Sequence, residues 1–471
     1  MSVIILYIID KTQTKHAIRH NYPVIGRMRY TLEHLATFFR QYFAEDREEL
    51  PFNRAERSWV YRAAKNLDNT VPFGSTKNID TPGTVYFTNC MYPTIEKDAV
   101  EPKAIIIGPY AKYPYSHESF FNISAMSYGS ISKPAVLALS KGAKMAGIWM
   151  NTGEGGLSPY HLEGGCDIVL QMGTAMFGVR NEQGLLSEDK LKATAAHEQV
   201  KMIEIKLSQG AKPGKGGILP GAKVTEEIAS IRHIPVGKDA ISPNRFPGIN
   251  NAEDMLSFVG HVREVSGKPT GIKLCVGNYE ELDDVCEAIL KKGIKAAPDF
   301  ITIDSGNGGT GASPMALIDN VGTPIRESLP LVVDMLNRYG LKERIKIIAS
   351  GKLITPSEVS WALCAGADFI NNARGFMFAL GCIQALQCNN NTCPTGVTTH
   401  NKRLQAGLNP VDKSVRVAHY AKNMLKEVGI IAHSCGVKEP RDLRRHHARV
   451  VTDMGKSISF AELYADEKEN N

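Results

Sequence analysis

The sequence predicts an α/β protein, namely a single (β/α)8 TIM barrel preceded by a mostly helical N-terminal extension. Two observations predict the barrel. From about residue 120, short runs rich in β-branched residues alternate with helical patterns, and each run ends in a turn that contains Gly, Ser or Asn. Eight such runs occupy roughly 260 residues, which is the size of one barrel. An open doubly wound sheet is the alternative that the same alternation permits.

The positions of the eight expected strands separate a barrel from a segment before it and a segment after it. The strands span residues 123–127, 148–151, 202–206, 240–242, 271–274, 300–303, 345–348 and 369–371. We expect residues 116–435 to form the barrel, 1–115 a helical or irregular extension, and 436–471 a C-terminal tail. Apolar residues at helical spacing predict an amphipathic region in the extension that packs on another element. They are Met28, Leu32, Leu35, Phe39 and Tyr42.

The composition excludes several classes of protein. With 471 residues, of which 43% are hydrophobic and 22% charged, the chain can bury a full core. The net charge is +6 and the basic residues lack interleaved aromatic residues, so we expect no nucleic-acid partner. The nine cysteines do not form evenly spaced pairs, which favours a reducing compartment. The apolar stretch 3–9 is much shorter than the ~20 residues that cross a bilayer. We therefore expect a cytoplasmic protein. A peripheral contact at the inner membrane and assembly into a homo-oligomer are two possibilities that the sequence leaves open.

Glycine-rich loops follow the last three expected strands. Residues 304–313 read DSGNGGTGAS, residues 350–351 are Ser-Gly, and residues 373–375 are Ala-Arg-Gly. Glycine lets backbone N–H groups approach an anion, and a helix N-terminus behind the loop adds a favourable dipole. A single loop of this kind would be an ordinary turn, but three on consecutive strands predict a phosphate site.

Charged and amide side chains follow the earlier strands. Glu154 stands between glycines after the second run, which favours contact with a ligand over a surface position. Lys206 ends the third run, and Gln209 and Lys212 follow it in a basic, glycine-rich loop. Because ammonium groups at a barrel mouth attract anions, we expect a substrate that carries carboxylates.

Lys273 lies inside the otherwise apolar fifth run. An unpaired ammonium group in a barrel interior would carry a large desolvation cost, so we expect it to meet a negative or electron-rich partner. A flavin ring or its ribityl oxygens would serve, and a neighbouring carboxylate is the alternative.

Three closely spaced cysteines follow the eighth run. Cys382, Cys388 and Cys393 form a C-x5-C-x4-C-P pattern, and we expect this loop, residues 382–393, to hold an iron–sulfur cluster. Three ligands suit a three-iron cluster. Structural zinc would usually require a fourth ligand, which His400 could supply. We expect the remaining six cysteines to be small buried hydrophobic residues.

In order and spacing, these motifs resemble the FMN-binding synthase domain of glutamate synthase large subunits, as in a stand-alone FMN-binding protein of that family. The resemblance runs from about Ile123 to Ile430. Besides the three cysteines it rests on residues 124–129 (SAMSYG), 153–156 (GEGG), 209–214 (QGAKPG), 219–221 (LPG) and 308–314 (GGTGASP). Several long motifs in one order are more specific than a lone glycine signature.

The resemblance implies a chemistry and a set of site residues. It implies FMN over the strand ends, a 3Fe-4S cluster that passes electrons to it, and reduction of 2-iminoglutarate, formed from 2-oxoglutarate and ammonia, to L-glutamate. It implies that the substrate is bound or protonated by Glu154, Lys206, Gln209 and Lys212. The cofactor contacts that we expect on this basis are Ala125, Met126, Ser127, Asn151, Gln171, Lys273, Ser305, Gly308, Gly309, Gly351, Arg374 and Gly375. Electrons would come from a donor protein, either ferredoxin or a reductase subunit.

The sequence departs from the family pattern in places that concern the substrate. It begins Met1-Ser2, without a cysteine nucleophile or an amidotransferase domain, so we expect glutamine to be used only through a separate amidotransferase subunit. Gly306-Asn307 stands where the family usually has His-Asp, and Asn244-Arg245-Phe246 replaces a stretch rich in proline and histidine.

Three alternatives stay open for the function. The chain could resemble the synthase-like subunit of N-methylglutamate synthase, which uses an amine in place of ammonia. It could also be an FMN barrel for hydroxy-acid oxidation or isomerisation, although such reactions need no one-electron relay through cysteines. The third alternative is an electron-transfer subunit without turnover. The chain lacks an evident dinucleotide-binding fingerprint, which makes direct use of NAD(P)H the weaker expectation.

Overall fold

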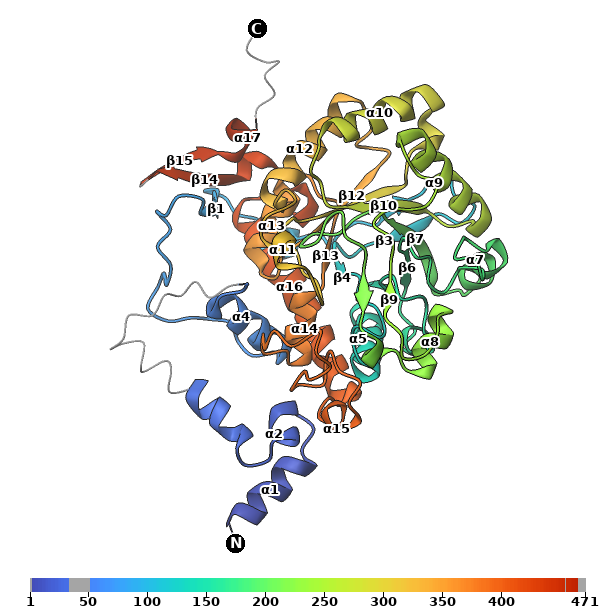
Figure 1. Ribbon diagram of the computed structural model, residues 1–471. Coiled ribbons are helices and arrows are strands. Elements are labelled where there is room, and N and C mark those ends of the chain that lie inside the picture. The colour runs from blue at the N-terminus through green and yellow to red at the C-terminus, as the bar shows by residue number, and fades with distance from the viewer. Residues whose placement is uncertain (1, 34–50, 454, 465–471) are drawn as a thin grey trace.

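The computed structural model describes residues 2–33, 51–453 and 455–464. Within these ranges eight parallel strands close into a barrel, which confirms the predicted fold (Figure 1). The strands follow one another around the ring in chain order, and β13 pairs with β4 to close it. They are β4 (Phe121–Ile123), β5 (Met150–Asn151), β6 (Ile168–Met172), β7 (Val200–Lys206), β10 (Thr270–Leu274), β11 (Phe300–Asp304), β12 (Lys346–Ser350) and β13 (Phe369–Asn372).

One of the eight expected strands was wrong. Residues 240–242 contribute β9 (Ala240–Ile241), which pairs antiparallel with β8 (Ile218–Leu219) outside the barrel. Strand β7 pairs directly with β10, with Ile205 opposite Ile272, so the barrel has no place for β9 between them. The missing strand is β6, all of whose residues are buried. A strand that is covered on both faces shows no alternation, and the Gln171 within it hid the apolar run.

The helices form a layer around the barrel. They are α5 (Lys133–Ala146), α6 (Pro159–Glu163), α7 (Glu188–Ala195), α8 (Glu226–Arg232), α9 (Ala252–Ser266), α10 (Glu280–Lys292), α11 (Met315–Ile318), α12 (Ile325–Arg338), α13 (Pro356–Cys364), α14 (Arg374–Leu380), α15 (Lys402–Gln405) and α16 (Pro410–Ser434). Helix α16 packs along α5 and completes the layer between the last strand and the first. Gly142 of α5 allows this close approach, because a Cβ there would lie 2.5 Å from the Val417 side chain.

The N-terminal end of the barrel is closed by a hairpin. Strands β2 (Ile105–Ile107) and β3 (Tyr115–His117) pair antiparallel, and Ile107 and Tyr115 pack on Trp149, Phe300 and Phe369. These aromatic residues lie at or just before the first residues of their strands. The hairpin therefore covers one end of the barrel, and the opposite end, where the strands finish, is left for a site.

The N-terminal extension and the C-terminal segment lie outside the barrel. The extension contains α1 (Ser2–Thr12), α2 (Ala17–Asn21), a helix over 26–33 and α4 (Arg54–Ala64). In that third helix Met28 and Leu32 are exposed, whereas Leu35, Phe39 and Tyr42 lie outside the described residues. Strand β1 (Val85–Phe87) joins β14 (Ala448–Asp453) and β15 (Lys456–Ser459), followed by α17 (Phe460–Leu463), so the expected tail forms a sheet with the extension. No described helix is long and apolar enough to cross a membrane.

Candidate active site

A cavity of about 640 Å³ opens at the carboxyl ends of the barrel strands. It brings together most of the site residues that the sequence predicts. Those that line it are Ala125, Met126, Ser127, Glu154, Gln171, Lys206, Gln209, Lys212, Lys273, Gly308, Gly309, Gly351, Arg374, Cys382, Cys388 and Cys393. Asn151, Ser305 and Gly375 are not among the described residues that line the cavity.

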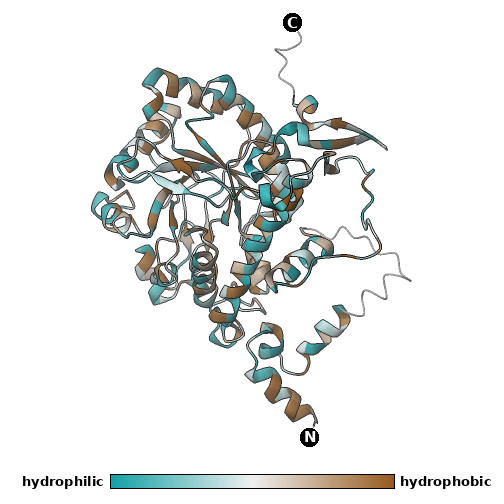
Figure 2. Ribbon diagram, turned by 180° about the vertical axis from the view of Figure 1, so that it is seen from behind, coloured by the Kyte–Doolittle hydropathy of each residue, from teal (hydrophilic) through white to brown (hydrophobic). Residues whose placement is uncertain are grey.

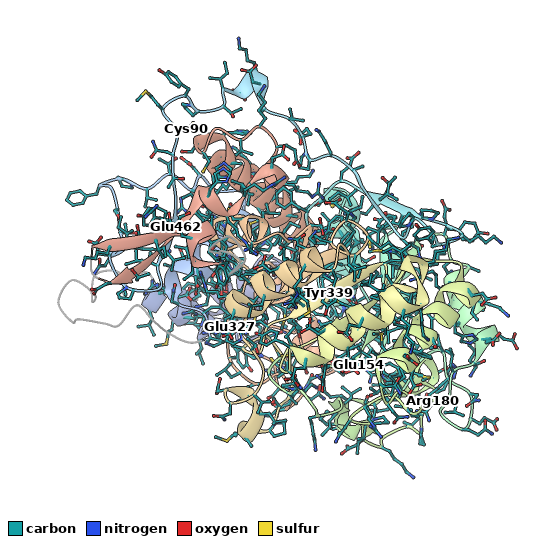
Figure 3. The ribbon with its side chains drawn as sticks, turned by 90° about the horizontal axis from the view of Figure 1, so that it is seen from above. Cys90, Glu154, Arg180, Glu327, Tyr339 and Glu462 are labelled. Carbon is teal, nitrogen blue, oxygen red and sulfur yellow. The ribbon has the colours of Figure 1, made fainter. Side chains whose placement is uncertain are left out.

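A chain of polar contacts crosses the mouth of the barrel. It begins at Glu154, which is labelled in Figure 3. Lys206 Nζ lies 2.9 Å from Glu154 Oε1 and donates a second hydrogen bond, also of 2.9 Å, to Gln209 Oε1. The Gln209 amide donates in turn to the carbonyl oxygen of Gly309, 2.8 Å away on the loop after β11. The contacts link loops after β5, β7 and β11, so three separate parts of the chain hold these side chains in place.

The electrostatics of this cluster favour charged side chains close to the cavity. Burial opposes ionisation of Glu154, but Lys206, Lys212 and Arg232 more than offset it and hold the pKa of this carboxyl below its ordinary value. Burial, reinforced by the charge of Lys206, lowers the pKa of Lys212 to about 8. A carboxylate and an ammonium group that titrates close to neutral pH are suited to binding an anion and moving a proton.

A second glutamate lies deeper in the barrel. Glu204 of β7 is 1% exposed, and its carboxylate accepts hydrogen bonds from Asn151 Nδ2 (2.8 Å), Gln171 Nε2 (2.6 Å) and Thr302 Oγ1 (2.6 Å). Asn151 thus points below the cavity, and Gln171 faces both Glu204 and the cavity wall. These neutral donors satisfy a buried carboxylate without a cation.

Lys273 pairs with a carboxylate of the neighbouring strand. Its Nζ lies 3.6 Å from Asp304 Oδ1, and the other oxygen of Asp304 accepts a hydrogen bond of 2.8 Å from the Gly210 N–H. The alternative of a carboxylate partner is therefore observed. Lys273 also lines the cavity, so the ammonium group faces Asp304 and the site at once.

The glycine loops after β11 and β12 touch each other at Ser305. Gly351 has φ +135°, and a Cβ at this position would lie 2.2 Å from Ser305 Cβ, so only glycine fits. Ser305 Oγ donates to Asn307 Oδ1 (2.6 Å) and accepts from the Ile325 N–H (2.9 Å). Ser305 thus shapes the loop from behind the cavity.

Arg374 and Gly375 follow β13 and have different surroundings. The Arg374 guanidinium lies over the Phe52 ring, 4.6 Å from its centroid, and burial lowers the pKa of Arg374 to about 10. Gly375 lies behind the cavity, where its N–H donates to Asn372 Oδ1 and a Cβ would lie 2.1 Å from the Tyr420 hydroxyl. Arg374 can therefore meet a ligand, whereas Gly375 allows α14 to pack on α16.

The three cysteines line one side of the same cavity. The Gln384 N–H lies 3.4 Å from Cys382 Sγ, and Thr395 Oγ1 lies 3.4 Å from Cys393 Sγ. Burial raises the pKa of Cys382 to about 12, whereas hydrogen bonds from Thr395 and Thr398 outweigh burial and lower the pKa of Cys393.

The described residues contain no group of three His, Cys, Asp or Glu side chains that could hold a metal ion. His400 Nε2 instead lies 2.7 Å from the carbonyl oxygen of Gly129, so the structure does not support the zinc alternative. Of the six remaining cysteines, all are buried except Cys90, which is half-buried.

Two buried cations at this site, Lys223 and Arg232, were not predicted from the sequence. Lys223 Nζ donates to the carbonyl oxygens of Ser130, Cys388 and Thr398 at 2.9–3.1 Å, and it thereby ties the cysteine loop to the barrel. Arg232 donates to the Tyr128 carbonyl oxygen at 3.0 Å, and burial lowers the pKa of Arg232 to about 10. Lys223 follows the quoted LPG motif and Arg232 ends a short helix, where a basic residue ordinarily faces solvent.

The chain is similar to known proteins over most of its length. Residues 89–438 match the family described as a conserved region in glutamate synthase. The glutamate synthase large subunit-like protein YerD of Bacillus subtilis is 41% identical over 498 aligned positions, which cover 97% of this chain and 94% of that protein. The archaeal glutamate synthase (NADPH) of Methanocaldococcus jannaschii is 36% identical over 330 positions, covering 70% of this chain and 61% of that protein.

The archaeal-type glutamate synthases are longer than the part that this chain matches. For the one from Thermotoga maritima, 35% identity extends over 68% of this chain and 60% of that protein. Among solved structures, the flavin-binding domain of flavocytochrome b2 from baker's yeast has a TM-score of 0.48 at 13% identity, covering 84% of this chain and 79% of that chain.

Proposed function

The chain belongs to the glutamate synthase family of oxidoreductases, and we propose that it reduces 2-iminoglutarate, formed from 2-oxoglutarate and ammonia, to L-glutamate with FMN as cofactor. The observation that carries this proposal is the cluster of Glu154, Lys206, Gln209 and Lys212 on the wall of the large cavity. A substrate with two carboxylates requires cations beside it, and an imine requires a group that can interact with its nitrogen.

The cavity fits FMN in size and in the chemistry of its walls. Its volume of about 640 Å³ lies within the range of roughly 300–1,000 Å³ that is common for cofactor sites. The hydrogen bond from Arg374 to the Asn307 carbonyl oxygen is long, at 3.5 Å, so the guanidinium is available to a phosphate. Bound FMN supplies a hydride. The residues that would hold it are Ala125, Met126, Ser127, Gln171, Lys273, Gly308, Gly309, Gly351 and Arg374.

The catalytic residues then have separate tasks. Lys206 and Lys212 bind the carboxylates of the substrate, and Gln209 holds Lys206 in place. Glu154 is ionised at neutral pH and stabilises the positively charged iminium form of the substrate. Lys212, whose pKa is about 8, can supply the proton that the product amine takes up.

We further propose a three-iron cluster on Cys382, Cys388 and Cys393. The three cysteines line one side of the cavity and would hold the cluster through their thiolates. The Gln384 N–H and the Thr395 hydroxyl lie within hydrogen-bonding distance of two of the sulfurs, and Lys223 places a positive charge behind the loop. Both features stabilise a negatively charged cluster. The cluster would take electrons from a donor protein, ferredoxin or a reductase subunit.

A second candidate function is the reduction of an imine formed from an amine, as in the synthase-like subunit of N-methylglutamate synthase. Asn307 supports it, because this residue lines the cavity where the family usually has an aspartate. A subunit that only transfers electrons would not need the complete set of polar side chains around Glu154, so this alternative is the less consistent one.

The remaining partners and the location are proposals from the sequence. A separate amidotransferase subunit would provide ammonia from glutamine, and the chain could form a homo-oligomer. We propose a cytoplasmic location. A contact at the inner membrane is favoured by α1, most of whose apolar side chains are exposed, and Figure 2 colours this helix as largely hydrophobic.

Spectroscopy followed by an assay tests the proposal. Absorbance and low-temperature electron paramagnetic resonance of freshly purified protein should show both flavin and a three-iron cluster. An assay with reductant, 2-oxoglutarate and either ammonia or methylamine then separates the two imine substrates. Colourless protein that contains neither iron nor flavin after reconstitution would contradict the proposal.

A further inference from the structure

We propose that a second, smaller cavity between the N-terminal segment and the barrel binds a small oxyanion, a phosphate or a carboxylate. The cavity has a volume of about 90 Å³ and is lined by residues 15–18 and 29–33, by α4 and α16, and by the end of α14. A single water needs roughly 10–15 Å³ of such volume, so a tetrahedral oxyanion has room. The cavity is separate from the large one, although both reach the segment that contains Ile383 and Thr395.

The walls of this cavity carry an excess of positive charge. Its lining includes five cations, which are Lys15, Arg29, Lys65, Lys413 and Arg416. Among the described residues of the lining, Glu33 is acidic, and its carboxylate pairs with Arg29 at 2.6 Å. Asp412 lies behind the wall, 3.4 Å from Arg416. Among the described residues, five cations thus stand against the Glu33 carboxylate in the lining and the Asp412 carboxylate behind it, and an anion would balance the remaining positive charge.

Lys413 is the central residue of this site. Its side chain is only 2% exposed, and its Nζ donates to the Lys15 carbonyl oxygen at 3.1 Å. Asp412 lies 3.8 Å away, which is too far for a hydrogen bond. An ammonium group has three N–H donors, so within the described residues Lys413 has donors left for a ligand. A buried ammonium group with only part of its donors satisfied destabilises the folded protein unless an acceptor occupies the cavity.

The titration behaviour of the neighbouring groups agrees with a strongly positive cavity. Burial, together with the charges of Arg416 and Lys65, lowers the pKa of Lys413 to about 7, although the Asp412 carboxylate acts in the opposite direction. Burial likewise lowers the pKa of His16 to about 4, with contributions from Lys65, Arg19, Arg416 and Lys413. A bound anion would relieve this mutual repulsion.

The site would join the N-terminal segment to the cysteine loop. Helix α2 already contacts that part of the molecule (Figure 1), where Asn21 donates to the carbonyl oxygens of Pro394 (3.0 Å) and Leu404 (2.9 Å). Tyr61, in the wall of the small cavity, donates to the Cys382 carbonyl oxygen at 2.6 Å. An anion here would therefore stabilise the surroundings of the proposed cluster from outside the active site.

Isothermal titration of the full-length protein, saturated with FMN, with inorganic phosphate tests the proposal. We expect binding to one site that is weakened about tenfold or more in Lys413→Met, because a charge-assisted hydrogen bond is lost. Arg416→Gln should weaken binding as well. Lys291→Met is the matched control, since this lysine is exposed and pairs with Glu253 far from the cavity. Acetate, as a competitor, tests whether a carboxylate binds in place of phosphate.

Two outcomes would overturn the proposal. One is the absence of binding of both phosphate and acetate to the wild-type protein. The other is equal binding by wild type and Lys413→Met, with circular dichroism and thermal unfolding confirming that the variant is folded. Phosphate bound at the rim of the active site would instead be lost in Arg374→Gln and retained in Lys413→Met. That pattern also counts against the second site, whether or not the proposed function holds.

Discussion

Glu154 and Glu204 lie in the same barrel, but their surroundings differ in kind. Glu204 and Lys206 are two residues apart on β7, and their side chains therefore lie on the same side of the strand. Glu204 points to a closed interior, where Asn151, Gln171 and Thr302 supply neutral donors. Glu154 meets the cation of Lys206 beside an open cavity.

This difference separates a structural carboxylate from a reactive one. A buried carboxylate whose two oxygens both accept from neutral donors of the barrel stabilises the barrel and is closed off from a substrate. A carboxylate that is held by a cation at a cavity wall can exchange part of this contact for a ligand.

The largest effect is expected for Glu154→Gln. This change removes the negative charge and keeps the shape, so we expect glutamate formation to fall by about 100-fold or more. The flavin absorbance of the purified variant should be unchanged, because Glu154 is not among the proposed FMN contacts. Steady-state assays and absorbance spectra check both points, and wild-type turnover in the variant would exclude Glu154 from the mechanism.

A comparable loss is expected for Cys388→Ser, by a different route. Without this ligand the cluster should not assemble, so its electron paramagnetic resonance signal should disappear and the donor protein should no longer reduce the flavin. Cys90→Ser is the control, because Cys90 is half-buried and lies away from Glu154 in Figure 3. An iron signal that persists in Cys388→Ser would defeat the assignment of this ligand.

Glu204→Leu should affect stability more than chemistry. It leaves the buried donors of Asn151, Gln171 and Thr302 without an acceptor, at a cost of about 1–3 kcal/mol for each unsatisfied group. We expect a clear decrease in the free energy of unfolding, measured by urea denaturation, whereas Glu154→Gln should stay within about 1 kcal/mol of wild type. If the two variants lost equal stability, the distinction between the two glutamates would fail.

The smallest effect is expected for the pH dependence that Lys212 imposes. Its pKa of about 8 lies below the ordinary 10.5, so in the folded protein its charge is present below pH 8 and is lost above it. The KM for 2-oxoglutarate should therefore rise severalfold as the pH increases through 8. In Lys212→Arg the charge persists to higher pH, because arginine stays protonated, and the rise should vanish. A KM profile that is the same in both proteins would mean that Lys212 does not bind the carboxylates.

Most of the barrel could be predicted because its signals are local. Strand runs that end in glycine or polar turns are visible in any short window, and seven of the eight expected runs belong to barrel strands. Strand β6 was missed for a physical reason, since a strand that is buried on both faces looks the same as any apolar segment. The run at 240–242 has strand composition, and its antiparallel pairing with β8 depends on a segment more than 20 residues away.

The amino-acid sequence alone was sufficient to predict most of the side chains that line the cavity and the spacing of the three cysteines, because strand ends in a parallel barrel meet at one rim. It could not show which partner each polar side chain meets. The pairing of Lys273 with Asp304, the inward turn of Asn151 and the inward-facing Lys223 and Arg232 depend on how the closed barrel places distant segments. Charge contacts and burial act between atoms that are close in space and distant in the chain, so only the tertiary structure decided them.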